Sequence, residues 1–187
     1  MAVVLLSYAI FLSACTQGRA ADNPDYPKAL SSYSDFKTLV NDVEKHRDSH
    51  LVSLNTFLKM QNESNTIVLD ARSSDRFGRK HLKGAIHLSF TDFTQANLNR
   101  IIPDPNTRIL IYCNNNFEGD QINFATKAVI PKAGRDNILQ NQKPLMLALN
   151  IPTYINLYGY GYTNVYELGE LVKINDKRIS FEGTDVK

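Results

Sequence analysis

The stretch Arg108-Ile109-Leu110-Ile111-Tyr112-Cys113 is an apolar run that ends at a cysteine, and it indicates the fold class. A short run of this composition is typical of a strand that is buried on both faces. A second strand of this kind is predicted at 66–70. Helical patterns alternate with these and other short apolar runs, and this order predicts an α/β domain with a mainly parallel central sheet flanked by helices.

The remaining elements are shorter. Strands are predicted at 51–53, 85–88 and 163–166, and helices at 54–61, 73–79, 90–99 and 145–158. Pro152 in the last helix either lies in a first turn or breaks the helix. Upstream, an N-terminal helix with Ser34 as its predicted N-cap is indicated by residues at three- and four-residue spacing, namely Phe36, Leu39, Val40 and Val43.

Composition limits the possible partners. The chain of 187 residues has room for one ordinary domain and a short appendage. With 43% hydrophobic and 21% charged residues and a formal charge of +2, it is too balanced for nucleic-acid or membrane-surface binding driven by bulk charge. No CxxC pair and no Cys/His cluster at metal-ligand spacing occurs in the sequence, so we expect neither a metal nor a cofactor.

The first segment has the layout of a targeting signal. Residues 2–12 are almost wholly apolar and are followed by Leu12-Ser13-Ala14-Cys15, as in a secretory cleavage site. The run is about half the roughly 20 residues that a membrane-spanning helix needs. Leu-Ser-Ala-Cys resembles the bacterial lipobox, in which the cysteine is lipidated. The alternative is a plain signal peptide, because no Lys or Arg precedes the apolar run.

This layout predicts three parts and a location. Residues 1–15 are the signal peptide, 16–33 a polar tether, and 34–187 the domain. The lipid on Cys15 would be the only membrane contact and would hold the protein on the periplasmic side of a bacterial membrane. If the lipobox is not used, the protein is secreted. An acylated Cys15 could not pair with Cys113, and Cys113 would be left as a single thiol in an oxidising compartment.

Cys113 is the candidate nucleophile. Ligands of open α/β sheets bind beyond the carboxyl ends of the strands, and the run 109–113 delivers a thiol to that edge. The loop that follows is rich in residues that tolerate turns, so its N–H groups could surround the sulfur and lower the pKa of the thiol. It comprises Asn114, Asn115, Asn116, Phe117, Glu118, Gly119 and Asp120. The alternative is a buried, inert cysteine at a strand end.

From Leu51 to about Val172 the chain resembles a rhodanese-like domain. The resemblance lies in four blocks in the family's order, namely 67–72 with Phe77, 81–88, 111–113 and 161–168. It implies that Cys113 takes a sulfane sulfur from a small sulfur-containing anion as a persulfide and passes it to a thiol or another nucleophilic acceptor. It also implies that Asp70 and Arg72 brace the active loop, although these two residues could instead only pair with each other. His81, Gly84 and His87 match a packing turn of the family.

The chain departs from the family pattern after the cysteine. Active rhodaneses usually end this loop in a basic residue, whereas positions 114–120 contain Glu118 and Asp120 and no Arg or Lys. A carboxylate beside the sulfur would oppose an anionic donor and raise the pKa of the thiol, unless it points outward. The same lack of arginine argues against a cysteine phosphatase. An insertion at about 121–144 offers Lys127 as a replacement cation, or is a surface excursion.

Three functions remain in competition. The leading hypothesis is a sulfurtransferase-like enzyme that carries sulfane sulfur on Cys113. The second is a catalytically degenerate binding module at the cell envelope, which uses the same pocket or a tyrosine-rich face. That face comprises Tyr154, Tyr158, Tyr160, Tyr162 and Tyr166, although tyrosines at such spacing more often pack in the core and its rim. The third is a thiol redox sensor, which would need a partner thiol.

Overall fold

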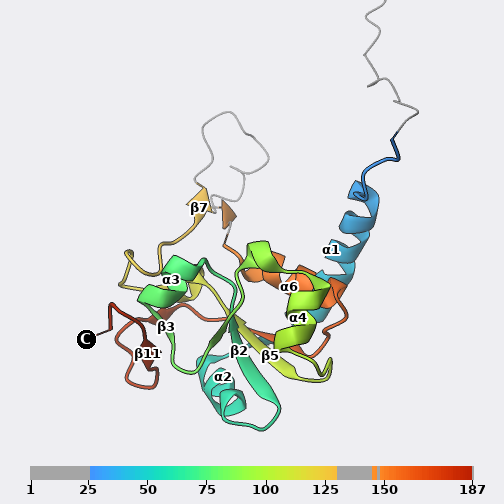
Figure 1. Cartoon of the computed structure of the whole chain (residues 1–187). Helices are drawn as coiled ribbons and strands as arrows, with labels where there is room; N and C mark the ends of the chain where they lie inside the picture. The colour runs from blue at the N-terminus through green and yellow to red at the C-terminus, as the bar shows by residue number, and fades with distance from the viewer. Residues whose placement is uncertain (1–25, 130–144, 147, 187) are drawn as a thin grey trace, which may run out of the picture. The chain divides into compact units, whose positions relative to one another are not determined.

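The computed structural model describes residues 26–129, 145–146 and 148–186, and Tyr33–Lys187 form one compact unit. At its centre is a five-stranded sheet with strand order β1-β9-β5-β2-β4, in which all four neighbouring pairs are parallel (Figure 1). The strands are β1 (Leu51–Val52), β2 (Thr66–Asp70), β4 (Ile86–His87), β5 (Arg108–Tyr112) and β9 (Val165–Leu168). The predicted α/β class with a mainly parallel sheet is confirmed.

Helices cover both faces of the sheet, because side chains alternate along each buried strand. One face carries Ile109 and Ile111 of β5 and packs under α1 (Tyr33–Asp48), α4 (Gln95–Ile101) and α6 (Asn150–Gly159). The other face carries Leu110 and Tyr112 and packs against α2 (Leu54–Gln61). Figure 1 shows α1, α4 and α6 on one side of the sheet and α2 on the other.

Side-chain caps explain where three short helices begin. The hydroxyls of Ser53, Ser73 and Thr94 accept backbone N–H groups at the starts of α2, α3 (Ser74–Arg79) and α4. The 3₁₀ turns η1 (Phe90–Asp92) and η2 (Asn114–Asn116) follow β4 and β5. Gly84 has φ of 76°, in the left-handed region that glycine adopts without strain, which agrees with its predicted role in a turn.

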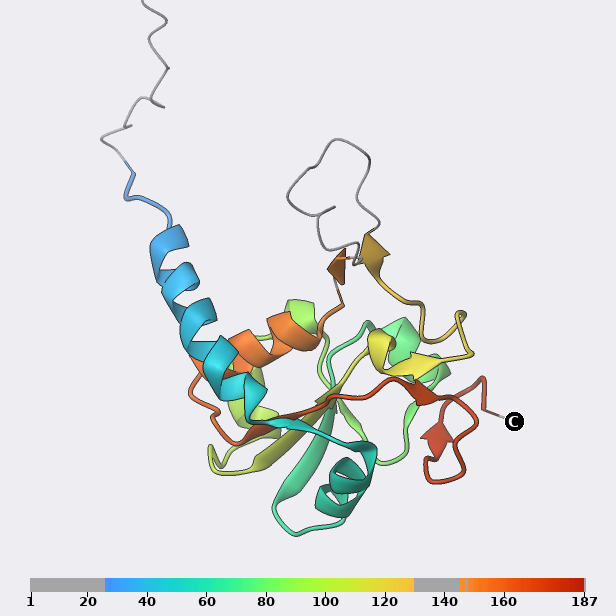
Figure 2. The same ribbon diagram turned by 180° about the vertical axis from the view of Figure 1, so that it is seen from behind.

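Three short two-stranded sheets lie beyond the carboxyl edge of the main sheet. β6 (Phe117–Glu118) pairs with β10 (Val172–Lys173) in parallel, and the two lie side by side in Figure 2. β3 (His81–Leu82) pairs antiparallel with β11 (Phe181–Glu182). β7 (Ala128–Val129) pairs antiparallel with β8 (Leu145–Met146).

Several sequence predictions need correction. The helix expected at 145–158 is a strand at Leu145–Met146 followed by α6, which begins at Asn150 and has Pro152 in its first turn. The N-terminal helix begins at Tyr33, so Ser34 lies inside it and is not its cap. The segment 90–99 is divided between η1 and α4. Of the insertion predicted at about 121–144, the structure describes residues 121–129, and Phe124 among them is fully buried in the core.

The other unit, Met1–Ser32, is described only from Tyr26, and these last residues form neither helix nor strand. Cys15, the predicted signal peptide and most of the tether lie outside the described residues. Within the part of the chain that the structure describes, no helix is both long and apolar enough to cross a membrane.

Candidate functional site

Cys113 follows directly after β5, at the carboxyl edge of the sheet, and is 2% exposed. Its sulfur accepts a hydrogen bond from the backbone N–H of Leu149, at 3.3 Å, in the loop before α6. Burial raises the pKa of the Cys113 thiol. The N–H groups of Leu149 and Asn114 and the charge of Arg72 act in the opposite direction without cancelling this effect, and Asp70 adds to it.

The residues after Cys113 form a compact turn. Asn116 receives the N–H of Cys113 on its Oδ1, at 2.8 Å, and donates from Nδ2 to the carbonyl of Leu168 at 2.6 Å. This amide therefore connects the end of β5 to the end of β9. Asn115 turns away and accepts the backbone N–H of Lys127 at 3.0 Å.

Neither acidic residue of the loop is among the groups that shift the pKa of Cys113. Phe117 enters the core, so Glu118, its neighbour in β6, is exposed on the outside. Asp120 forms a salt bridge with Lys80 at 3.0 Å and accepts the N–H of Asn123. The sequence could not show these directions, because they depend on the turn at 114–116.

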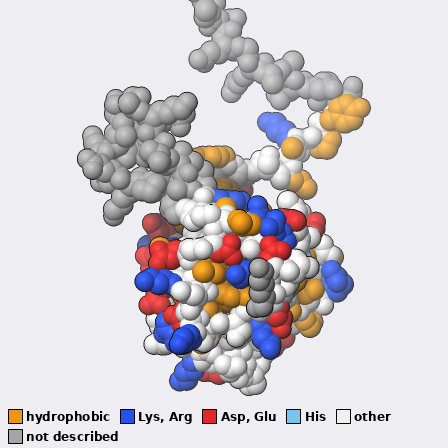
Figure 3. Space-filling view, turned by 90° about the vertical axis from the view of Figure 1, so that its left-hand side faces the viewer, with side chains coloured by type: hydrophobic (Ala, Val, Ile, Leu, Met, Phe, Trp, Pro, Cys, Tyr) orange, Lys and Arg blue, Asp and Glu red, His pale blue; other side chains and the backbone are white. Residues whose placement is uncertain are grey.

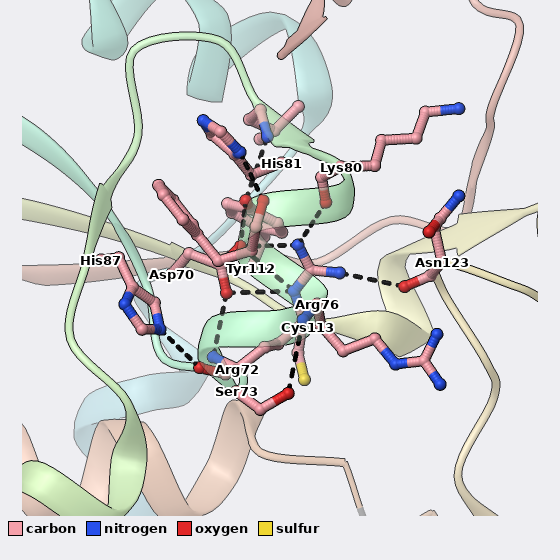
Figure 4. A network of polar contacts seen from close by, with 12 residues as sticks. Asp70, Arg72, Ser73, Arg76, Lys80, His81, His87, Tyr112, Cys113 and Asn123 are labelled. Atoms are coloured by element: carbon pink, nitrogen blue, oxygen red, sulfur yellow. Dashed lines mark hydrogen bonds and ion pairs between the residues drawn. The ribbon is translucent and has the colours of Figure 1, made fainter. Parts of the chain in front are cut away.

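Asp70 and Arg72 form the centre of a buried polar network (Figure 4). Arg72 donates from Nε and Nη2 to the Asp70 carboxylate, with a shortest distance of 2.7 Å. Burial alone would lower the pKa of Arg72, but the hydrogen bonds and charge of Asp70 raise it above its ordinary value. Tyr112 donates to Asp70 at 2.5 Å and accepts the N–H of Leu82.

The same arginine holds neighbouring segments together. Arg72 donates to the carbonyls of Asn123 and Lys80, at 3.1 and 2.7 Å, and its guanidinium lies 4.5 Å from the ring centre of Phe124. Its carbonyl accepts from His87 Nε2 at 2.8 Å. Asp70 and Arg72 thus pair with each other, and Arg72 also contacts the chain at Asn123, beyond the cysteine loop. That the pair braces the loop stays a prediction.

A hollow of about 390 Å³ lies beside the cysteine loop, and Asn114 and Leu149 form part of its wall. Three cations, Arg72, Arg76 and Lys127, line it, and the described residues of its lining include no carboxylate. Arg76 donates to the carbonyl of Ile122. In the described part of the chain, neither Arg76 nor Lys127 has a salt bridge. Because Arg72 is paired with Asp70, Arg76 and Lys127 are the two cations of the described lining that remain to attract an anion.

The rest of the lining is mixed. Ser73, Ser89 and Thr91 supply hydroxyl groups, and Ala71, Phe90, Ala125 and Leu149 supply apolar surface. The side of the protein shown in Figure 3 has acidic and basic side chains interspersed on its described part. Attraction of an anion thus depends on the local cations of the hollow.

A second hollow, of about 320 Å³, lies on the other side of the turn, where Asn115 and Asn116 line it. Its polar lining includes an ion pair in which Arg47 donates from Nε and Nη2 to Glu167, at 2.6 and 2.7 Å. The hydrogen bonds to Glu167 raise the pKa of Arg47, and burial partly opposes this rise. The guanidinium is thus neutralised within the protein.

Other predicted site residues have structural contacts. Tyr154 and Tyr162 are buried, and their hydroxyls donate to the carbonyls of Val165 and Ile102. His81 stacks on Phe77 with ring centres 3.7 Å apart. The described residues contain no group of three or more His, Cys, Asp or Glu that could hold a metal ion.

Three contributors were missed by the sequence analysis. Arg76 had a usable signal, because it is a cation in the first turn after the β2 edge. Leu149 acts through its backbone N–H, for which no side-chain signal exists. The packing of Tyr112 against Asp70 depends on the register of β2 and β5, where the two are direct partners.

The comparison with protein families agrees with this architecture. Residues 53–168, more than half of the chain, match the rhodanese-like domain family. Comparison with curated proteins gives no match. Among solved structures, the BH2092 protein from Bacillus halodurans is similar, with 18% identity and a TM-score of 0.32, covering 46% of this chain. The chain spans 64% of that structure's length. On the family match, this protein belongs to the rhodanese-like domain family.

Proposed function

We propose that the protein is a sulfurtransferase in which Cys113 accepts a sulfane sulfur from a small anionic donor and passes it to a thiol or another nucleophile. The Cys113 thiol gives up its proton to solvent or to the donor remnant, its sulfur forms a bond to the outer sulfur of the donor, and the bond between that sulfur and the rest of the donor breaks. The electron pair of the broken bond leaves with the donor remnant. The acceptor then attacks the outer sulfur of the persulfide, the sulfur–sulfur bond breaks, and the Cys113 sulfur leaves with the electron pair and regains its proton.

One observation carries this proposal. The sulfur lies against Leu149, and Leu149 and Asn114 also line a cationic hollow whose described residues include no carboxylate. An anionic donor in this hollow would be held next to the nucleophile. The outward direction of Glu118 and the Lys80 partner of Asp120 remove the electrostatic objection raised by the acidic loop. Lys127 supplies a cation that the loop itself lacks.

The test is the intact mass of the purified chain before and after thiosulfate, polysulfide or an organic persulfide, with Cys113→Ser as the control. A persulfide adds one sulfur, about 32 Da, and cyanide removes it. We expect this gain in the wild type alone. Absence of an adduct with every donor would contradict the proposal.

The second candidate is a binding module that no longer transfers sulfur. The observation in its favour is the burial of Cys113 together with its raised pKa, which make the thiol a poor nucleophile at rest. In that case Cys113→Ser would leave the biological role intact. Loss of the role in Cys113→Ser, in a variant with unchanged stability, would exclude the binding module.

We also propose that the protein is attached to the periplasmic side of a bacterial membrane by a lipid on Cys15. The supporting observation is the apolar run that ends in Leu12-Ser13-Ala14-Cys15. Incorporation of labelled fatty acid into the wild type, and not into Cys15→Ser, would support this. A wild-type protein that is secreted without lipid would overturn it.

A further inference from the structure

We infer that Asn150 is a positioning residue, whose side chain holds the start of α6 against the turn at 114–116 and thereby keeps the backbone N–H of Leu149 on the Cys113 sulfur. This role rests on the proposed sulfurtransferase function, in which the Cys113 thiol must give up its proton. Asn150 lies outside the cysteine loop, so no motif around Cys113 includes it.

The Cys113 sulfur receives backbone N–H groups from Asn114 and Leu149. Asn114 directly follows the cysteine, so the chain itself places its N–H. Leu149 is 36 residues away from Cys113 along the chain and donates at 3.3 Å. The position of its N–H therefore has to be fixed by a contact between the two segments.

Leu149 directly precedes α6 and occupies its N-cap position, where no side chain makes a capping hydrogen bond. Its carbonyl accepts the N–H of Thr153 at 2.8 Å, and its own N–H donates to the Cys113 sulfur. N–H groups at the start of a helix have no partner within the helix and favour negative charge nearby. The Leu149 N–H is thus suited to a thiolate, provided that the start of α6 stays in place.

A contact between two asparagine side chains fixes the start of α6. The Oδ1 of Asn116 accepts the backbone N–H of Cys113 at 2.8 Å, and because a backbone N–H can only donate, this atom of the amide is the oxygen. The same Oδ1 lies 2.9 Å from the amide of Asn150, which therefore donates from Nδ2. Asn150 is the first residue of α6 and follows Leu149 directly, so the contact connects the N–H of Leu149 to the turn at 114–116.

The rest of α6 does not depend on Asn150. Tyr154, Ile155 and Leu157 of this helix are buried in the core. In Asn150→Ala the Oδ1 of Asn116 keeps the N–H of Cys113, so this buried acceptor still has a partner and the variant should fold. The change should therefore act on the first turn of α6 and on the Leu149 N–H that the first turn presents to the sulfur.

Titration of Cys113 by NMR tests this role without any sulfur donor. In the full chain labelled with carbon-13 cysteine, the chemical shift of the Cys113 Cβ reports ionisation of the thiol, and Cys113→Ser identifies the signal. We expect the pH midpoint to be about 1 higher in Asn150→Ala, because a hydrogen bond to a charged group has at least about a tenfold effect. Hydrogen exchange of the Leu149 amide at neutral pH should be about tenfold faster.

The matched control is Asn156→Ala, on the same helix. Asn156 is likewise half-buried, and its Nδ2 donates to the carbonyl of Pro152 at 2.9 Å, so this variant also loses one side-chain hydrogen bond. Arg72 and Asp70, the charged groups that act on Cys113, are unchanged in both variants. Asn156→Ala should keep the wild-type midpoint and the wild-type exchange rate of Leu149.

The outcomes distinguish positioning from a general loosening of the helix. A midpoint in Asn150→Ala equal to that of the wild type, or an equal rise in Asn156→Ala, would overturn the positioning role. So would a Leu149 amide that exchanges at the wild-type rate in Asn150→Ala. Because both readouts use no donor, a raised midpoint in a protein that never gains sulfur would overturn only the proposed transfer.

Discussion

Arg72 donates two of its nitrogens to the carboxylate of Asp70 inside a protein core where the two residues are 2% and 0% exposed. The two residues lie two positions apart at the end of β2. The Asp70 carboxylate also accepts the backbone N–H of Arg72, and these hydrogen bonds fix the backbone where the chain leaves the sheet. Because Arg72 also bonds to the chain at Asn123, the pair connects the β2 edge to the segment after the cysteine loop. The ion pair thus connects two segments that border the cationic hollow.

Replacing Arg72 should reveal how much this pair stabilises the fold. In Arg72→Met the carboxylate of Asp70 remains buried without its partner, and we expect the free energy of unfolding to fall by about 3–5 kcal/mol. The double variant Asp70→Asn/Arg72→Met should lose less than the sum of the two single changes, because no charge stays buried. Urea denaturation measures both effects. The control is Arg79→Met, whose ion pair with Asp185 is one-third exposed and should contribute at most about 1 kcal/mol. Equal losses in Arg72→Met and Arg79→Met would contradict the structural role.

The parts of the fold that local sequence determines were predicted well. The strands at 66–70 and 108–112 and the helix at 54–61 have the observed bounds, because the strands are uninterrupted apolar runs and Ser53 caps the helix. The segment at 145–146 was wrongly predicted as helix. Its residues suit either state, and its pairing with β7 is a contact between distant parts of the chain.

The candidate site was predictable only in part. Cys113 could be placed at the sheet edge because the strand before it has a clear end. The direction of Glu118 could not be predicted, since it follows from the 3₁₀ turn that sends Phe117 into the core. The hollow brings Arg76 of α3 together with Lys127 of the insertion, and no local pattern links these two positions.

Alkylation of Cys113 should depend on pH in a way that distinguishes the folded from the unfolded chain. Burial raises the pKa of the Cys113 thiol above its ordinary value of about 9.0, so the midpoint of reaction with iodoacetamide should be higher for the native protein than in denaturant. Because the pKa of Cys113 is higher in the folded than in the unfolded chain, the protonated thiol stabilises the fold fully at pH values below the unfolded pKa. This stabilisation is lost as pH rises through the folded pKa. The free energy of unfolding should therefore decrease above about pH 9 by more in the wild type than in Cys113→Ser. A native midpoint at or below the denatured one would contradict the closed geometry of the site.

Two glycines near α3 offer a matched test of the C-terminal packing. Gly183 has φ of 128°, and an added Cβ would lie 2.4 Å from the carbonyl oxygen of Arg79, so Gly183→Ala forces the backbone to move. We expect a loss of more than about 1 kcal/mol in thermal or urea unfolding. Gly78→Ala, inside α3 with open space around the new Cβ, should stabilise the protein by about 0.5–1 kcal/mol. A Gly183→Ala variant as stable as the wild type would show that the C-terminal segment does not pack on α3 in this way.

The cations of the hollow should determine how well an anionic donor reacts. Lys127→Ala and Arg76→Gln each remove a charge that no carboxylate in the described chain neutralises, and we expect kcat/KM for an anionic donor to fall about tenfold. The effect should shrink as ionic strength rises, because the Debye length falls from about 10 Å at 0.1 M salt to about 3 Å at 1 M. Lys173→Ala, an exposed cation of β10 outside the hollow, is the control and should react like the wild type at every salt concentration. Unchanged turnover in Lys127→Ala would show that the insertion does not replace the charge missing from the loop. Because Arg76 and Lys127 lie on segments that meet only in the folded chain, a salt-dependent loss in both variants would locate the donor between α3 and the insertion.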